Sequence, residues 1–95
     1  MRVAALFALG QVTATVGAFQ DFGPALIAEL LQRHLAGDWG ALDAHDIQAS
    51  NQALRTGARL LSTYETPAGR CWILTEGTDD TGARRSTCVL RPHGY

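Results

Sequence analysis

Residues 33–43 read Arg-His-Leu-Ala-Gly-Asp-Trp-Gly-Ala-Leu-Asp, and this stretch marks the point where one predicted helix ends and the next begins. It contains a histidine, two acids, an arginine, a tryptophan and two glycines in eleven residues. Gly37 is typical of a helix end, and Asp43 is typical of a residue that caps a helix start. Polar groups at this density either cap the two helices or form a site, and the stretch alone is consistent with both.

The segment before this junction predicts a strand and then a helix. Residues 3–15 are rich in Val, Leu, Phe and Thr and indicate a strand, and residues 16–22 indicate a turn or a short helical piece. Gly23-Pro24 then opens a clear helix, with Pro at its first position. Its buried face is formed by residues three and four apart, namely Ile27, Leu30, Leu31, His34 and Leu35.

The segment after the junction predicts a second helix and three strands. Asp43 caps a helix that has Asp46 at its third position and ends at Gly57. Strands follow at about 58–65, 70–76 and 84–91, separated by glycine-containing turns. We therefore expect residues 1–95 to form one α+β domain. Its predicted architecture is an N-terminal strand, two helices, and then a three-stranded antiparallel meander packed on the helices.

Composition and charge narrow the class of protein. The chain is 46% apolar and 18% charged, as expected for a folded domain, and its net charge is −1. Residues 1–54 hold two Arg and five acids, whereas residues 55–95 hold six Arg and four acids. The net charge gives no general attraction to nucleic acid or to anionic lipid, and the mild asymmetry fits a solvated surface as well as a binding face. No apolar segment approaches the roughly 20 residues that a membrane-spanning helix needs.

The N-terminus and the cysteines bear on the compartment. The apolar run that follows Met1-Arg2 resembles a short secretory signal, but its continuation into Gln11-Val12-Thr13-Ala14-Thr15 favours a strand. Cys71 and Cys88 match no metal-binding spacing, and their strand register decides whether they share a face. We favour free buried thiols in a reducing cytosol, so the predicted location is cytoplasmic.

His34 allows two interpretations. It is either a core histidine bonded to polar neighbours or a general base paired with Asp38 or Asp43. Because no nucleophile motif accompanies it, we favour the core residue and predict no enzyme, no catalytic residue and no cofactor. His45 and the nearby aspartates show none of the short ligand spacings of metal centres, so no metal site is predicted.

Several motifs carry a resemblance to a known family. They are Arg33-His34, the Gly-Asp-Trp-Gly segment at 37–40 and the Trp-Ile-Leu-Thr-Glu segment at 72–76, together with residues 7–18. The chain resembles a family of small bacterial proteins found on plasmids, integrated elements and phage-like regions, some of them linked to restriction–modification. The resemblance spans nearly the whole chain and implies a setting in mobile DNA, without implying catalytic residues.

The first functional hypothesis is a non-enzymatic protein–protein interaction module. Anti-defence inhibitors, including anti-CRISPR proteins, are of this size and cover a surface of a larger machine, and the resemblance makes a bacterial defence complex the expected partner. Acids that mimic phosphates would form the binding surface. The candidate residues are Asp38, Trp39, Asp43, Asp79 and Asp80, although a core position is the favoured interpretation of Trp39.

The alternative hypothesis is a small protein associated with nucleic acid. Its candidate contacts are Arg55, Arg59, Arg84, Arg85 and Arg91. Arg84 and Arg85 are adjacent in a strand, so they point to opposite faces and cannot grip one phosphate together. An edge strand of the sheet can also pair with a second copy, which leaves a homodimer open.

Overall fold

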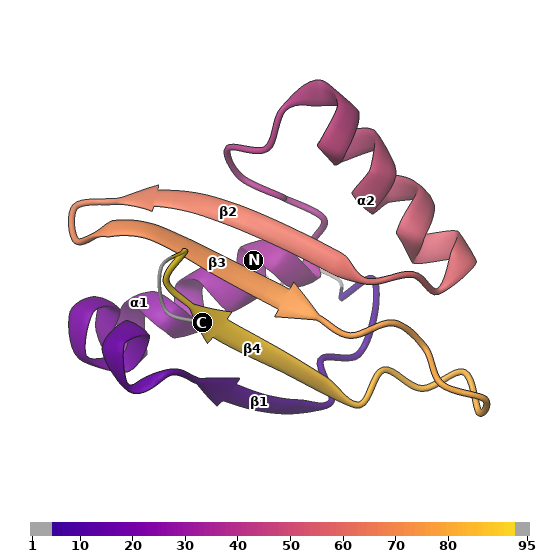
Figure 1. The fold of residues 1–95 in the computed structure, drawn as a ribbon, viewed down its shortest axis with the longest axis horizontal. Helices are drawn as coiled ribbons and strands as arrows, with labels where there is room; N and C mark the ends of the chain where they lie inside the picture. The colour runs from indigo at the N-terminus through magenta and orange to yellow at the C-terminus, as the bar shows by residue number, and fades with distance from the viewer. Residues whose placement is uncertain (1–4, 93–95) are drawn as a thin grey trace.

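The structure, a computed structural model, describes residues 5–92. Its elements are two consecutive helices and the four strands of one mixed sheet (Figure 1). In chain order they are β1 (Gln11–Ala14), α1 (Val16–Leu35), α2 (Ala44–Thr56), β2 (Leu60–Thr66), β3 (Gly69–Thr75) and β4 (Ser86–Leu90). The predicted α+β class is confirmed. Among the described residues, neither helix combines the length and the apolar character required to cross a membrane.

The sheet has four strands in the order β1-β4-β3-β2, which corrects the predicted three-stranded meander. The antiparallel pairing of β2, β3 and β4 agrees with the prediction. The N-terminal strand, however, joins the same sheet by running parallel to β4. The N–H of Gln11 donates to the carbonyl of Arg85, and the N–H of Thr15 donates to the carbonyl of Val89. This pairing joins opposite ends of the chain, which local sequence patterns do not reveal.

The N-terminal elements differ from their predicted bounds. The strand predicted over residues 3–15 is confined to Gln11–Ala14, preceded by Gly10 with a φ of +65°, and its first two predicted residues lie outside the described range. Thr15 caps α1 by accepting the N–H of Ala18, so the helix begins at Val16 rather than at Gly23. At the predicted helix start the structure has a kink instead. Gly23 has a φ of +77° and interrupts the helix just before Pro24.

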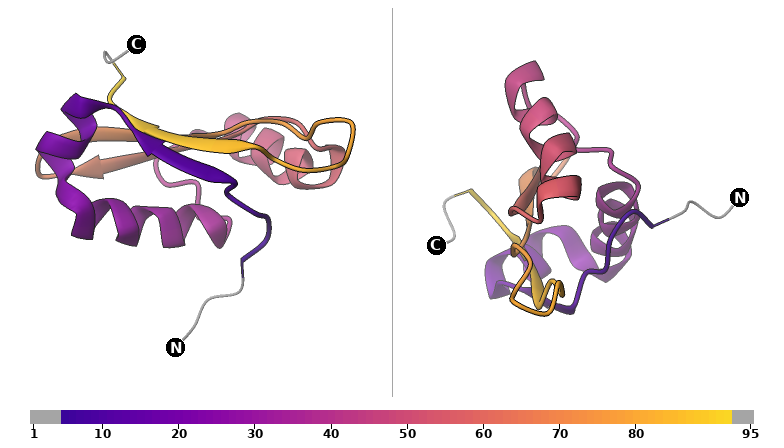
Figure 2. Two further views of the ribbon diagram at one scale, coloured as in Figure 1. Left: turned by 90° about the horizontal axis from the view of Figure 1, so that it is seen from below. Right: turned by 90° about the vertical axis from the view of Figure 1, so that its right-hand side faces the viewer.

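The bounds of α2 agree closely with the prediction. The Asp43 carboxylate accepts the N–H of Asp46 at 2.8 Å, and Gly57 ends the helix in the left-handed conformation with a φ of +83°. The position of α2 does not agree with the prediction. Only α1 covers a face of the sheet, whereas α2 lies beside the β2 edge (Figures 1 and 2). Leu60, Ala53 and Trp39 form a second, smaller core there.

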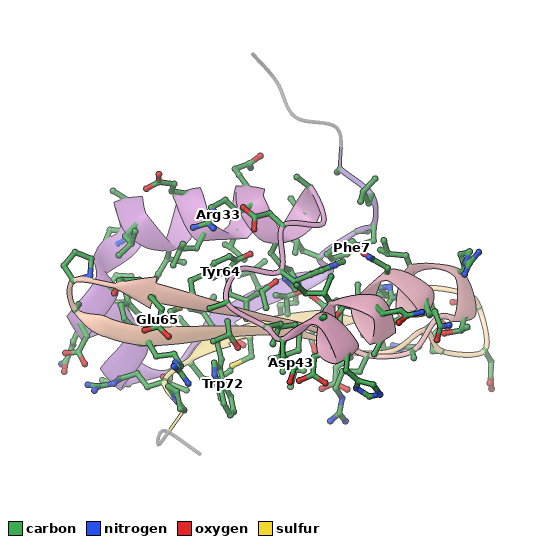
Figure 3. All side chains as sticks on the ribbon, turned by 90° about the horizontal axis from the view of Figure 1, so that it is seen from above. Phe7, Arg33, Asp43, Tyr64, Glu65 and Trp72 are labelled. Carbon is green, nitrogen blue, oxygen red and sulfur yellow. The ribbon has the colours of Figure 1, made fainter. Side chains whose placement is uncertain are left out.

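The strand register assigns each residue to one face of the sheet. Tyr64, Cys71, Ile73 and Val89 face α1 and form the main core with its apolar side. Figure 3 shows Tyr64 directed toward α1 and Trp72 directed away from it. By the same register Cys88 lies on the face opposite Cys71, so the two thiols cannot approach each other, and both are free. Cys71 is buried and Cys88 is partly exposed.

Candidate functional site

A chain of polar side chains is buried between α1 and the sheet. His34 is 0% exposed, and its two ring nitrogens contact Ser62 Oγ at 2.5 Å (Nδ1) and Thr75 Oγ1 at 2.9 Å (Nε2). Thr75 Oγ1 lies 2.7 Å from Thr87 Oγ1, and Thr87 donates to the carbonyl of Leu9 at 2.8 Å. Each hydroxyl has a single proton, so the carbonyl of Leu9 determines the direction of every bond in the chain.

This directionality assigns the tautomer of His34. The Thr87 hydroxyl donates its one hydrogen bond to the Leu9 carbonyl, so the Thr75 hydroxyl must donate to Thr87. Because Thr75 can then only accept from the ring, His34 Nε2–H donates to Thr75. The neutral ring accepts at Nδ1 from the Ser62 hydroxyl. Burial, together with the charge of Arg84, lowers the pKa of His34 to about 4, which keeps the ring neutral near pH 7. With every group satisfied, the network is a structural core element.

The buried position of His34 removes the condition on which the general-base interpretation depended. That interpretation required the imidazole to be reachable from solvent, and the ring is fully covered. Asp38 and Asp43 make their hydrogen bonds elsewhere, to Arg33, Gly40 and Asp46, rather than to His34. The core interpretation of His34 is therefore the one that the geometry supports.

The depressed pKa of His34 predicts an acid-sensitive fold. Between pH 6.5 and about 4 the unfolded chain binds a proton that the folded chain does not, so the stability from neutral His34 is complete above pH 6.5 and lost as pH falls toward 4. The loss is about 3 kcal/mol when the shift is converted at 1.36 kcal/mol per pKa unit. Urea unfolding between pH 4 and 7 measures it. His34→Gln, which keeps a donor and an acceptor but does not titrate, should weaken the dependence of the unfolding free energy on pH. An unchanged pH dependence in that variant contradicts the assignment.

Asp38 organises the junction between the two helices. Its carboxylate accepts from Arg33 Nε at 2.7 Å and from the N–H of Gly40 at 3.1 Å, and its carbonyl accepts from the Tyr64 hydroxyl at 2.6 Å. The Arg33 guanidinium also lies over the Tyr64 ring. Hydrogen bonding to Arg33 lowers the pKa of Asp38. The carboxylate is therefore half-exposed, and Arg33 and the N–H of Gly40 already donate to it.

Trp39 belongs to the core, which corrects its inclusion in the predicted partner surface. Its side chain is 2% exposed and packs with Phe7, Ala53 and Leu60. The indole N–H donates to Asn51 Oδ1 on α2 at 2.9 Å. Burial of the ring together with a satisfied N–H shows that Trp39 attaches α2 to the rest of the domain.

Asp43 lies at the start of α2 in a group of three exposed side chains. Ligand atoms of Asp43, His45 and Asp46 lie within 4.8 Å of one another. The Asp43 carboxylate is the helix cap, and His45 Nδ1 lies 3.6 Å from the Asp46 carboxylate. Hydrogen bonding within the first turn of a helix accounts for this cluster.

The acids of the β3–β4 turn lie apart from Asp38 and Asp43 at the junction of the two helices. Asp79 accepts from the backbone of Thr81 and Ala83 and from the Thr81 hydroxyl, and it pairs with Arg85 at 2.6 Å. These bonds, led by the Thr81 hydroxyl, hold the pKa of Asp79 far below its usual range. Asp80 is exposed beside it. The turn contacts Gly57 at the end of α2, so the roughly 20 Å length of that helix separates Asp79 and Asp80 from Asp43.

The five candidate arginines are distributed rather than gathered. Arg84 points inward and Arg85 outward, which confirms their predicted opposite directions. Three of the four candidates other than Arg84 have an acidic partner within the domain. The pairs are Arg59 with Glu76, Arg85 with Asp79, and Arg91 with Asp21, while Arg55 is exposed on the last turn of α2. Together they do not form the dense basic patch that phosphate binding requires.

The outward face of the sheet is a candidate binding surface that was not predicted from the sequence. It presents apolar side chains where an open face usually presents polar ones. By register these are the partly exposed Leu61, Trp72, Leu74 and Cys88, whereas Leu90 on the same face is only 4% exposed. Neither helix covers this face (Figure 2, left), and exposed ion pairs Glu65–Arg70 and Arg59–Glu76 flank it at two ends. The uninterrupted apolar runs at 60–61, 72–74 and 89–90 were the signal, because a one-sided strand would alternate.

The fold and its surfaces define a small α+β domain with one helix-covered sheet face and one open apolar face. Comparisons with family models, with curated proteins and with solved structures gave no match. The resemblance to mobile-element proteins therefore stays a prediction.

Proposed function

We propose that this protein is a non-enzymatic binding module that docks on a larger protein through the outward face of its sheet. The observation that carries the proposal is that apolar side chains lie on both faces of the sheet, although α1 covers only one of them. Tyr64, Cys71 and Ile73 pack under α1, and Leu61 and Leu74 lie partly exposed on the opposite face. An apolar centre with a charged rim is the usual anatomy of a protein interface.

The resemblance to mobile-element proteins supports a bacterial defence complex as the partner. In that role the domain acts as an inhibitor that covers a surface of the complex. The apolar face would supply the buried centre of the contact, and the ion pairs at its rim would meet mixed charges on the partner. Acidic mimicry of phosphate is the less favoured mode, because Asp38 and Asp79 already pair with Arg33 and Arg85.

The test is affinity capture from a bacterial host lysate with two matched double variants. Leu61→Thr with Leu74→Thr removes apolar area from the face while keeping residues suited to strands. Asp43→Asn with Asp80→Asn removes two charges while keeping a side chain that can cap α2. Because each lost leucine contact contributes on the order of 1–2 kcal/mol, the first variant should recover at least about tenfold less partner, and the second should match wild type.

Other outcomes of the capture separate the alternatives. Loss of the partner in the Asp variant alone would assign binding to the acidic residues predicted from the sequence. Capture of nuclease-sensitive, DNA-bound proteins, with direct binding that weakens steeply with salt, would indicate the nucleic-acid role instead. Circular dichroism and melting of both variants check that the fold is intact.

A further inference from the structure

The two edges of the sheet differ in whether their backbone groups are covered. The outer edge of β2 is covered by the helix junction, where Ala41 N–H donates to the carbonyl of Thr63 and Thr63 N–H donates to the carbonyl of Trp39. Within residues 5–92, no strand pairs with the outer edge of β1. The N–H groups of Gln11 and Thr15 point to β4, so alternation directs the N–H and C=O groups of Val12 and Ala14 away from the sheet.

The side chains around this edge lack the usual protection. Natural edge strands carry charges, prolines or bulges that prevent pairing. Residues 10–20 contain no charged residue and no proline. Val12, Val16 and Phe19 are 41%, 74% and 53% exposed, and they account for three of the four exposed large apolar side chains in the described part of the chain. Beside them an apolar groove of about 330 Å³ runs between β1 and α1, lined by Val12, Phe19, Ile27 and Leu31.

We propose that the β1 edge binds a second copy of this chain, antiparallel and with the two-fold axis at Thr13. In this register Val12 lies opposite Ala14 of the other copy, and the two pairs exchange four backbone hydrogen bonds. The two sheets become one continuous eight-stranded sheet. Val12 of each copy lies beside Ala14 of the other, at the mouth of the groove.

A second copy is the occupant that the charges favour. The edge is uncharged over eleven consecutive residues, so two copies meet without like charges and without leaving a charge unpaired. The same edge is self-complementary in donors and acceptors, because Val12 and Ala14 each direct one N–H and one C=O outward. This surface is separate from the outward face of the sheet, so the dimer does not depend on the proposed function.

Symmetric cross-linking tests the register directly. Across the axis, Thr13 faces Thr13 of the other copy at a Cα separation of about 4.5 Å, within disulfide range. In a Cys88→Ser background, Thr13→Cys should therefore oxidise mostly to a covalent dimer. Gln11→Cys is the matched control, because Gln11 lies opposite Thr15 and its two copies are about 14 Å apart. Equal cross-linking at both positions, or none at Thr13, overturns the proposed register.

A pair of proline variants tests the edge itself by sedimentation equilibrium. Val12→Pro removes an N–H that points outward, so it should give a folded monomer at concentrations where the wild type is a dimer. Val12→Lys should give the same result through charge repulsion. Thr13→Pro removes an N–H that faces β4 and should instead lower the melting temperature. A monomeric wild type, or a dimer that persists in both Val12 variants, overturns the proposal.

Discussion

Replacing Gly40 by alanine is expected to lower the free energy of unfolding by about 2–5 kcal/mol, from two sources. Gly40 has a φ of +74°, and this left-handed conformation costs a residue with a side chain about 1–2 kcal/mol. A Cβ at Gly40 would also overlap the carbonyl oxygen of Thr63 and lie 2.7 Å from Cδ1 of Tyr64. The backbone of the junction would have to move away from β2, at a cost of about 1–3 kcal/mol for the overpacked site.

The consequence of Gly40→Ala extends beyond one contact. Trp39 and Ala41 flank this glycine and hydrogen-bond to Thr63, so a shift of the junction weakens the cover on the β2 edge. It also displaces the indole that connects α2 to the domain through Asn51. We therefore expect the loss of stability to be accompanied by increased hydrogen exchange in α2.

Gly82→Ala is the matched control for Gly40→Ala. Gly82 has a φ of +83°, and a Cβ there would meet no atom within 4 Å. Its substitution should cost only the conformational part, about 1–2 kcal/mol. Urea unfolding of both variants separates the two contributions. Equal losses at Gly40 and Gly82 would show that the close approach of the junction to β2 is not a constraint.

Replacing Arg84 by methionine is expected to lower the free energy of unfolding by about 3–4 kcal/mol. The Arg84 side chain is 8% exposed, and its guanidinium donates to three backbone carbonyls: Ala53 on α2, Ala58 and Glu76. It therefore satisfies carbonyls at the end of α2 and beside the sheet with one cation. Methionine removes the guanidinium donor from all three carbonyls, of which that of Ala53 keeps the N–H of Gly57 as a second donor.

The neighbouring residue supplies the control for Arg84→Met. Arg85 pairs with Asp79 in solvent, and its side chain is 77% exposed. Arg85→Met should change the stability by less than about 1 kcal/mol, because exposed ion pairs contribute little. A similar cost for the two substitutions, measured by urea unfolding at constant salt, would mean that the buried guanidinium does not hold α2 in place.

Part of the fold could be predicted because its signals are local. The Asp43 cap, the Gly57 end and the apolar face of α1 at Ile27 and Leu30 depend on residues within one or two helical turns. The opposite directions of Arg84 and Arg85 follow from the alternation of extended residues, although both precede β4, which begins at Ser86. These predictions agree with the structure for that reason.

The candidate site was harder to predict, because burial depends on neighbours far along the chain. Trp39 carries the same sequence signal whether it is a contact residue or a core residue, and Leu60 and Ala53 decide the matter by packing on it. His34 likewise appears as a candidate base until Ser62 and Thr75, 28 and 41 residues later, enclose its ring.

The sequence by itself determined the class of the domain, the meander of β2, β3 and β4, and the caps of α2, since each is encoded in the spacing of nearby residues. Only the tertiary structure decided that β1 joins β4, that α2 lies beside the sheet, and that the apolar residues Leu61 and Leu74 face outward. The physical reason is that strand pairing and burial are properties of the whole assembled chain. A period-two pattern shows that a strand has two faces, but the position of α1 decides which of them is covered.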